Sequence, residues 1–162
     1  MRSSSLSGAV VASVLVLLAA VASGSDPDVA GMVRPIEAME KAIKARDQAQ
    51  FKAQWVPAGY EANLVGGSGL PGREVYGQAT GEGWFLKADV ARLHQDGRDG
   101  AYLVPCLIWS WEKGRAVDEV WVLPIWDEAT KRWLVLGAGE ELDEVVALAR
   151  RYLSKQPLAP AP

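Results

Sequence analysis

Three runs rich in β-branched and aromatic residues fill the segment between Ala101 and Gly139, and short polar turns separate them. Such runs, closed by turn residues, are typical of neighbouring antiparallel strands. The first turn, Lys113-Gly114, ends in glycine, which favours a tight two-residue hairpin. The pattern therefore predicts an antiparallel meander with strands at Ala101–Glu112, Arg115–Asp127 and Arg132–Gly137.

The turns also predict a register for this meander. A two-residue first turn places Cys106 opposite Trp121, and the second hairpin places Trp126 beside Trp133. Because strand side chains alternate, every residue falls on one of two faces, and a slip of one residue would exchange the assignments. Both faces are apolar, so we expect both to be covered. One face carries Val104, Cys106, Ile108, Glu119, Trp121, Leu123, Ile125, Leu134 and Leu136, and the other carries Leu107, Trp109, Trp111, Asp118, Val120, Val122, Trp126, Trp133 and Val135.

The N-terminus has the pattern of a secretory signal peptide. Met1-Arg2 provides a positive start, Ala9–Val21 is a short apolar run, and small residues around Ala22 suit cleavage there. We expect residues 1–22 to be removed on export to the periplasm or the medium, leaving no stable membrane span. An uncleaved anchor is the alternative.

Charge and cysteine content limit the chemistry of the chain. The 162 residues carry a formal charge of −3, which becomes −4 without residues 1–22 and their one arginine, so no basic surface for nucleic acid is expected. The one cysteine, Cys106, lies in a predicted strand and is interpreted as a buried structural thiol rather than a nucleophile. His94, the one histidine, is expected at the surface, on the other face from Cys106. A single cysteine and a single histidine argue against the common zinc sites, and no metal or cofactor is expected.

Helical patterns flank the meander. After a loosely ordered lead-in at residues 23–34, a helix is predicted from Pro35 to about Gln54, with Asp47 as the one carboxylate on its apolar stripe. Arg73–Leu86 is predicted as a second helix, with a strand as the alternative. A third helix is predicted at Glu140–Leu153, followed by a disordered Pro/Ala-rich tail at residues 155–162.

Two further segments complete the predicted domain, which spans residues 35–154. Trp55–Gly72 has the composition of a loop, and its run Gly66–Gly69 lacks the context of a phosphate-binding motif. Ala88–His94 is predicted as the first strand of the sheet.

A helix that ends in tryptophan, followed by a curved antiparallel sheet in hairpin order, resembles the NTF2-like (SnoaL-like, cystatin-like) superfamily. The segments that carry the resemblance are Ala42–Trp55 and Ala101–Gly139. It implies an α+β cone in which the sheet wraps around N-terminal helices and encloses a pocket. The predicted C-terminal helix is an addition to that plan. Some members are isomerases, dehydratases or hydrolases, and many bind ligands or proteins without chemistry, so the fold does not decide the function.

The predicted inner surfaces of the cone supply candidate site residues. Asp47 and Glu119 could form a carboxylate pair in which one group raises the pKa of the other, as acid–base catalysis requires. Alternatively, Asp47 caps a backbone segment and Glu119 pairs with an arginine. Enzymes of the family use an Asp–His or Tyr–Asp arrangement, and this chain places no histidine in the cone. The expected ligand-binding residues are Trp55, Tyr60, Cys106, Glu119 and Trp121.

The second predicted sheet face carries four tryptophans, an apolar patch that a monomer rarely exposes. Either a second copy covers it, forming a homodimer, or the C-terminal helix does. The interface residues predicted on this basis are Trp109, Trp111, Trp126 and Trp133.

Three functions are therefore compatible with the sequence. The leading hypothesis is an exported NTF2-like domain that binds a small apolar ligand or a partner protein without catalysis. The alternative is an isomerase, dehydratase or hydrolase that uses Asp47 and Glu119. The third is a structural module with a filled cone.

Overall fold

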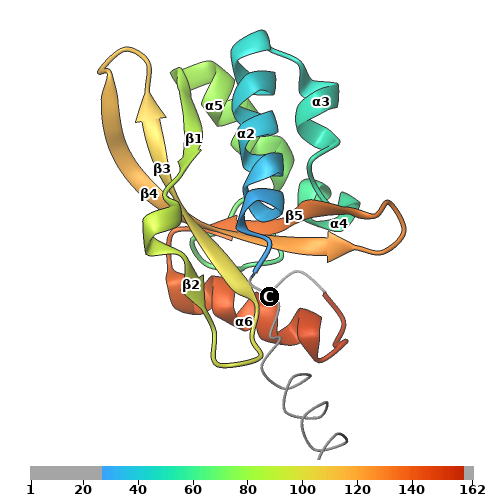
Figure 1. Ribbon diagram of the computed structural model, residues 1–162. Helices are drawn as coiled ribbons and strands as arrows, with labels where there is room; N and C mark the ends of the chain where they lie inside the picture. Colours follow the sequence, from blue (N-terminus) through green and yellow to red (C-terminus); the bar gives the residue numbers. More distant parts are fainter. Residues whose placement is uncertain (1–26, 159–162) are drawn as a thin grey trace, which may run out of the picture.

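The computed structural model describes residues 27–158 (Figure 1). The predicted signal peptide, with its cleavage site near Ala22, lies outside the described residues, as do residues 23–26 and 159–162. In chain order the elements are α2 (Val29–Ala45), α3 (Gln48–Lys52), α4 (Pro57–Glu61), α5 (Gly72–Glu82), β1 (Trp84–Ala88), a 3-10 turn (Val90–Arg92), β2 (His94–Gln95), β3 (Tyr102–Ser110), β4 (Arg115–Asp127), β5 (Arg132–Gly139) and α6 (Leu142–Leu153).

The sheet is antiparallel throughout and strongly curled. Its strands follow the order β1-β3-β4-β5, and the short β2 pairs with the start of β3. In Figure 1, α2, α3 and α5 lie on one side of the curled sheet, and α6 lies across the other end. The protein is therefore an α+β domain with a curled antiparallel sheet, as the sequence predicted. Within residues 27–158, no helix has the length and apolar character needed to cross a membrane.

The long N-terminal helix differs from its prediction at both ends. It begins at Val29 rather than Pro35, because the Asp28 carboxylate caps it by accepting from the Gly31 N–H at 2.9 Å. It ends at Ala45, because Arg46 adopts a left-handed conformation with φ of 55°. Asp47 then starts a separate helix, α3, and is not part of an apolar stripe.

The segment before the meander also differs from its prediction. Arg73–Leu86 contains both of the predicted alternatives, since α5 ends at Glu82, capped by Gly83 with φ of 75°, and β1 starts at Trp84. The strand predicted at Ala88–His94 is wrong. Its middle, Val90–Arg92, is a 3-10 turn, Ala88 ends β1, His94 begins the short β2, and β1 takes the sheet position beside β3.

The predicted pairing is right for one hairpin and wrong for the other. Trp126 pairs with Trp133 as expected. In the β3–β4 hairpin, Cys106 pairs with Val120 and not with Trp121. The turn is wider than two residues, since the Gly114 N–H donates to the Ser110 carbonyl. The wider turn displaces the predicted pairing of β3 with β4, and a bulge beside Trp109 reverses only part of that displacement. The net slip of one residue exchanges the predicted faces of β3 relative to β4.

Two apolar clusters result, one on each side of the sheet. The inner core joins the helices to the concave face, and the α6 core lies between α6 and the other face. Principal members of the inner core are Ile36, Met39, Ile43, Phe51, Val104, Cys106, Val122 and Val135, and those of the α6 core are Leu103, Leu123, Ile125, Leu136, Val145 and Leu148. The helix α6 thus covers the face of Leu123 and Leu136, not that of Val122 and Val135.

Candidate functional site

The two acids proposed for catalysis lie in separate places. The Asp47 carboxylate caps α3 by accepting from the Gln50 N–H at 3.0 Å. The Glu119 carboxylate forms an ion pair with Arg92. Glu119 lies opposite Leu107, on the side of the sheet away from the inner core, whereas Asp47 joins two helices on the inner side. The structure therefore does not bring the two acids together as a pair.

The five residues expected to bind a ligand do not share a cavity either. Trp55, Tyr60 and Cys106 are buried in the inner core, where Gln48 Nε2 donates to the Tyr60 hydroxyl at 3.1 Å. Burial raises the pKa of the Cys106 thiol far above its usual range, so the thiol stays protonated. Trp121 lies on the opposite side with the α6 core. Trp55, Tyr60 and Cys106 therefore all contribute to the packing of the inner core.

The space between α5 and the sheet is small. A mainly apolar pocket of about 70 Å³ opens there, bordered by side chains such as Val75, Leu86, Ile108 and Val120. Sites for organic ligands usually measure about 300–1,000 Å³. Large side chains of the inner core occupy most of this region.

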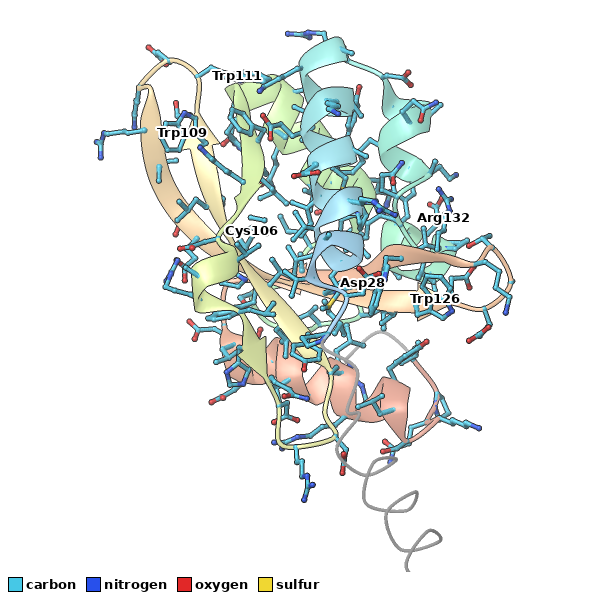
Figure 2. All side chains as sticks on the ribbon, viewed as in Figure 1. Asp28, Cys106, Trp109, Trp111, Trp126 and Arg132 are labelled. Atoms are coloured by element: carbon cyan, nitrogen blue, oxygen red, sulfur yellow. The ribbon has the colours of Figure 1, made fainter. Side chains whose placement is uncertain are left out.

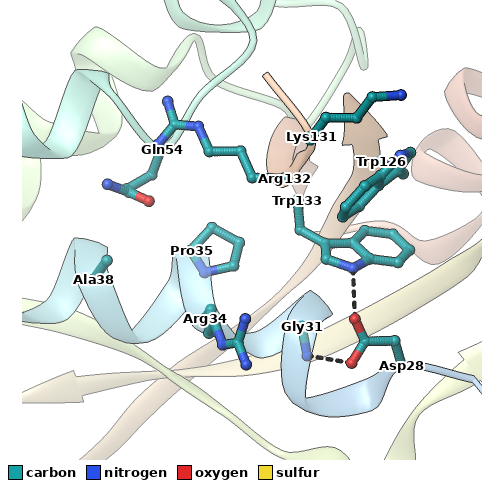
Figure 3. A pocket seen from close by; sticks show the side chains of 10 residues that line it. All are labelled: Asp28, Gly31, Arg34, Pro35, Ala38, Gln54, Trp126, Lys131, Arg132 and Trp133. Atoms are coloured by element: carbon teal, nitrogen blue, oxygen red, sulfur yellow. Dashed lines mark hydrogen bonds between the residues drawn. The ribbon is translucent and has the colours of Figure 1, made fainter. Parts of the chain in front are cut away.

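A larger groove lies between the start of α2 and the β4–β5 hairpin (Figure 3). We call it the α2–hairpin groove, and its volume is about 470 Å³. Both of its walls are regular elements, so its shape depends on backbone that is well supported by hydrogen bonds. The residues that line it are Asp28, Gly31, Arg34, Pro35, Ala38, Gln54, Trp126, Lys131, Arg132 and Trp133.

Hydrogen bonds fix the aromatic wall of this groove. Trp133 Nε1 donates to Asp28 Oδ2 at 3.0 Å, while the other Asp28 oxygen accepts from the Gly31 N–H (Figure 3). A Cβ atom at Gly31 would lie 2.7 Å from Trp133 Cδ1, so the close approach of the indole to α2 requires glycine there. Trp126 packs edge-on against Trp133, with ring centroids 6.0 Å apart, and is 40% exposed.

Cations predominate among the charged groups that line the groove. The lining contains Arg34, Lys131 and Arg132 and one carboxylate, Asp28, although Lys131 forms an ion pair with Glu128. The Gly31 N–H, the Trp133 indole and the Arg34 charge lower the pKa of Asp28, so this group remains an anion engaged in structural bonds. Arg132 donates through Nη2 to the Ala53 carbonyl at 2.7 Å, which orients its guanidinium. The groove thus combines exposed aromatic surface with guanidinium groups suited to an oxyanion.

The four predicted interface tryptophans are divided between the two hairpins of β4. Trp109 and Trp111 lie near the β3–β4 turn, and Trp126 lies at the other end of the sheet (Figure 2). Trp133 pairs with Trp126. The four residues therefore do not form one patch, and a homodimer through them stays a prediction.

The glycine-rich loop holds a carboxylate of the same chain. Ser68 donates through both its N–H and its hydroxyl to Glu144 Oε2, at 2.9 and 2.7 Å. These bonds lower the pKa of Glu144. The loop anchors the start of α6, and both Ser68 donors are occupied by this contact.

Comparisons of the chain with protein-family models, curated proteins and solved structures gave no significant match. The NTF2-like resemblance therefore stays a prediction. In residues 27–158, no three His, Cys, Asp or Glu side chains cluster closely enough to hold a metal ion.

The sequence contained only part of the signal for the α2–hairpin groove. The pairing of Trp126 with Trp133 follows from the second turn, but the sequence predicts that a second copy or the C-terminal helix covers both. The contact between Asp28 and Trp133 spans 105 residues, and the segment around Asp28 was predicted as a loose lead-in. An Asp three residues before a glycine in a helix-forming stretch could have indicated the N-cap.

Proposed function

We propose that this protein is an exported binding domain without catalysis, and that its ligand is an organic anion with a planar or apolar body. The observation that carries the proposal is the α2–hairpin groove, in which an exposed tryptophan and two arginines border one space of ligand size. The guanidinium groups suit an anionic group, and the Trp126 ring suits an apolar body.

Two further points support binding over catalysis. The acids Asp47 and Glu119 are engaged by a backbone donor and by an arginine, respectively. The groove itself is lined by one carboxylate, Asp28, whose two oxygens accept from Gly31 and Trp133. A general base needs an accepting atom within hydrogen-bond reach of its substrate.

The proposed fold is a variant of the NTF2-like cone. A curled antiparallel sheet with α2, α3 and α5 on its concave side supports this assignment. In the proposed variant, aromatic side chains fill the cone, α6 is added behind the sheet, and the binding site lies outside the cone. Export rests on the signal-peptide pattern of residues 1–22.

Two fluorescent dyes that differ in one charged group test the binding proposal. The probes are 8-anilino-1-naphthalenesulfonate, which is anionic, and N-phenyl-1-naphthylamine, which is its neutral analogue. We expect Trp126→Ala to weaken both dyes, and Arg34→Gln or Arg132→Gln to weaken the sulfonate about 3- to 10-fold while the neutral dye is unaffected.

Trp111→Ala is the matched control, because Trp111 is also 40% exposed but lies at the other hairpin. It should leave both affinities unchanged, and a thermal melt of each variant excludes dye binding to unfolded chains. Sulfonate binding that is insensitive to both arginines, or no saturable binding of either dye, would contradict the proposal.

A further inference from the structure

A second groove adjoins the α2–hairpin groove and has a different character. Its volume is about 280 Å³, and no charged side chain lines it. It lies beside Pro124–Trp126, a stretch of β4 that pairs with β5 beyond the last β3 pair at Val122. We call it the apolar groove, and its lining residues are Gly100, Ala101, Tyr102, Pro124, Ile125, Trp126, Trp133, Tyr152 and Leu153.

The two grooves share Trp126 and Trp133. The indole pair therefore forms a boundary with cations on one side and apolar surface on the other. Both sides are open at the surface, since Trp126 is 40% and Leu153 is 49% exposed. A molecule that lies across the tryptophans would contact guanidinium groups at one end and aliphatic and aromatic side chains at the other.

We infer that the ligand is an anionic amphiphile, with its head group at Arg34 and Arg132 and its hydrocarbon chain across Trp126 into the apolar groove. This inference rests on the proposed function and specifies its substrate class. Charge complementarity selects the occupant, because the arginines match a carboxylate or phosphate head while the lining beyond the tryptophans is uncharged. A small polar anion would leave the apolar groove empty, and a neutral lipid would offer the arginines no anionic group.

A chain-length series tests the inference. The exported protein is titrated by calorimetry with hexanoate, octanoate and decanoate below their micelle concentrations, and with decanol as the uncharged counterpart of decanoate. Each added methylene that enters the apolar groove should tighten binding about two- to fourfold. Decanoate should bind at least about threefold more tightly than decanol, and Arg34→Gln with Arg132→Gln should remove that difference.

Leu153→Gln tests the contribution of the apolar groove independently of that of the α2–hairpin groove. Leu153 and Val90 are both 49% exposed, so Val90→Gln is the matched control for an exposed aliphatic side chain. Leu153→Gln should flatten the chain-length dependence while keeping the preference for decanoate over decanol. Val90→Gln should change neither quantity.

The outcomes distinguish this inference from the proposed function. One outcome is a preference for the charged ligand that depends on the arginines but no dependence on chain length. This outcome overturns the inference that the ligand is an amphiphile and retains the proposed anion site. No preference for the charged ligand overturns both. If the apolar groove instead contacts a second copy, the parent protein should sediment as a dimer that Leu153→Gln dissociates, and the chain-length series should be flat.

Discussion

The two hairpins of β4 use the same residue type in opposite ways. At the β3–β4 hairpin, Lys87 lies over the ring of Trp109, and Trp111 packs against Phe85, which itself lies under Lys44. At the β4–β5 hairpin, Trp126 and Trp133 pack against each other and border the grooves.

The neighbours of each tryptophan pair account for this difference. Lysine stems cover apolar surface while the ammonium groups remain in water, so Lys87 partly covers Trp109, whereas Trp111 stays 40% exposed but has no groove beside it among those described above. The second pair has Asp28 holding one indole and arginines around the open space. A count of tryptophans therefore does not identify a binding surface, whereas the groups that cover or leave open their rings do.

The largest expected difference between the hairpins concerns stability. Trp133→Ala removes a half-buried ring, its packing on Trp126 and its bond to Asp28, and should lower the free energy of unfolding by about 2–3 kcal/mol. Trp111→Ala removes a more exposed ring and should cost about 1 kcal/mol or less. Denaturant titration of both variants measures these values, and equal losses would show that the Asp28 contact contributes nothing.

A smaller difference should appear in acid. The pKa of Asp28 is lowered mainly by the Gly31 N–H and the Trp133 indole, so its contribution to stability is complete above the ordinary carboxyl pKa. It is lost as the pH falls through the lowered value, and the emission of Trp133 should change in that range.

Asp28→Asn is the control for the acid titration. Asparagine also caps helices through its side-chain oxygen, but its amide group is a poor partner for the indole N–H. The variant should therefore lack this emission change while retaining α2. An identical acid titration in parent and variant would exclude Asp28 as the titrating group.

The smallest effect is expected at the covered pair. Lys87→Met keeps much of the apolar stem but removes the charge over Trp109, and should cost about 0.5 kcal/mol. A double-mutant cycle with Trp109→Ala measures the coupling. A coupling energy of zero would mean that the lysine covers the ring without binding it.

Local sequence patterns predicted the parts of the fold that local forces determine. The β4–β5 hairpin has a polar turn, and the pairs next to it, from Asp127–Arg132 to Ile125–Leu134, were predicted correctly, although the register shifts further on, between Leu123 and Pro124. The β3–β4 register was wrong because a wider turn and a bulge depend on contacts made after the chain folds. No glycine or proline marks the break after Ala45, where Arg46 takes a left-handed conformation, so α2 and α3 were predicted as one helix.

The groove was harder to predict than the sheet. Its walls come from α2 and β5, which are joined through contacts between residues such as Asp28 and Trp133 that lie far apart in the chain. Alternation and helical periodicity report which side of an element is apolar, but not which distant element it meets. The cations of the groove belong to two such elements and appeared in the sequence as scattered surface charge.

The contact between Ser68 and Glu144 has a consequence for competition with free anions. Because the carboxylate is tethered to the same chain, it faces the loop at an effective concentration of millimolar order or higher. A free phosphate or sulfate at micromolar concentration would be outcompeted by this internal anion. The same loop could bind such ions only after the start of α6 had moved away, so occupation of the loop by solute anions would report the release of that helix.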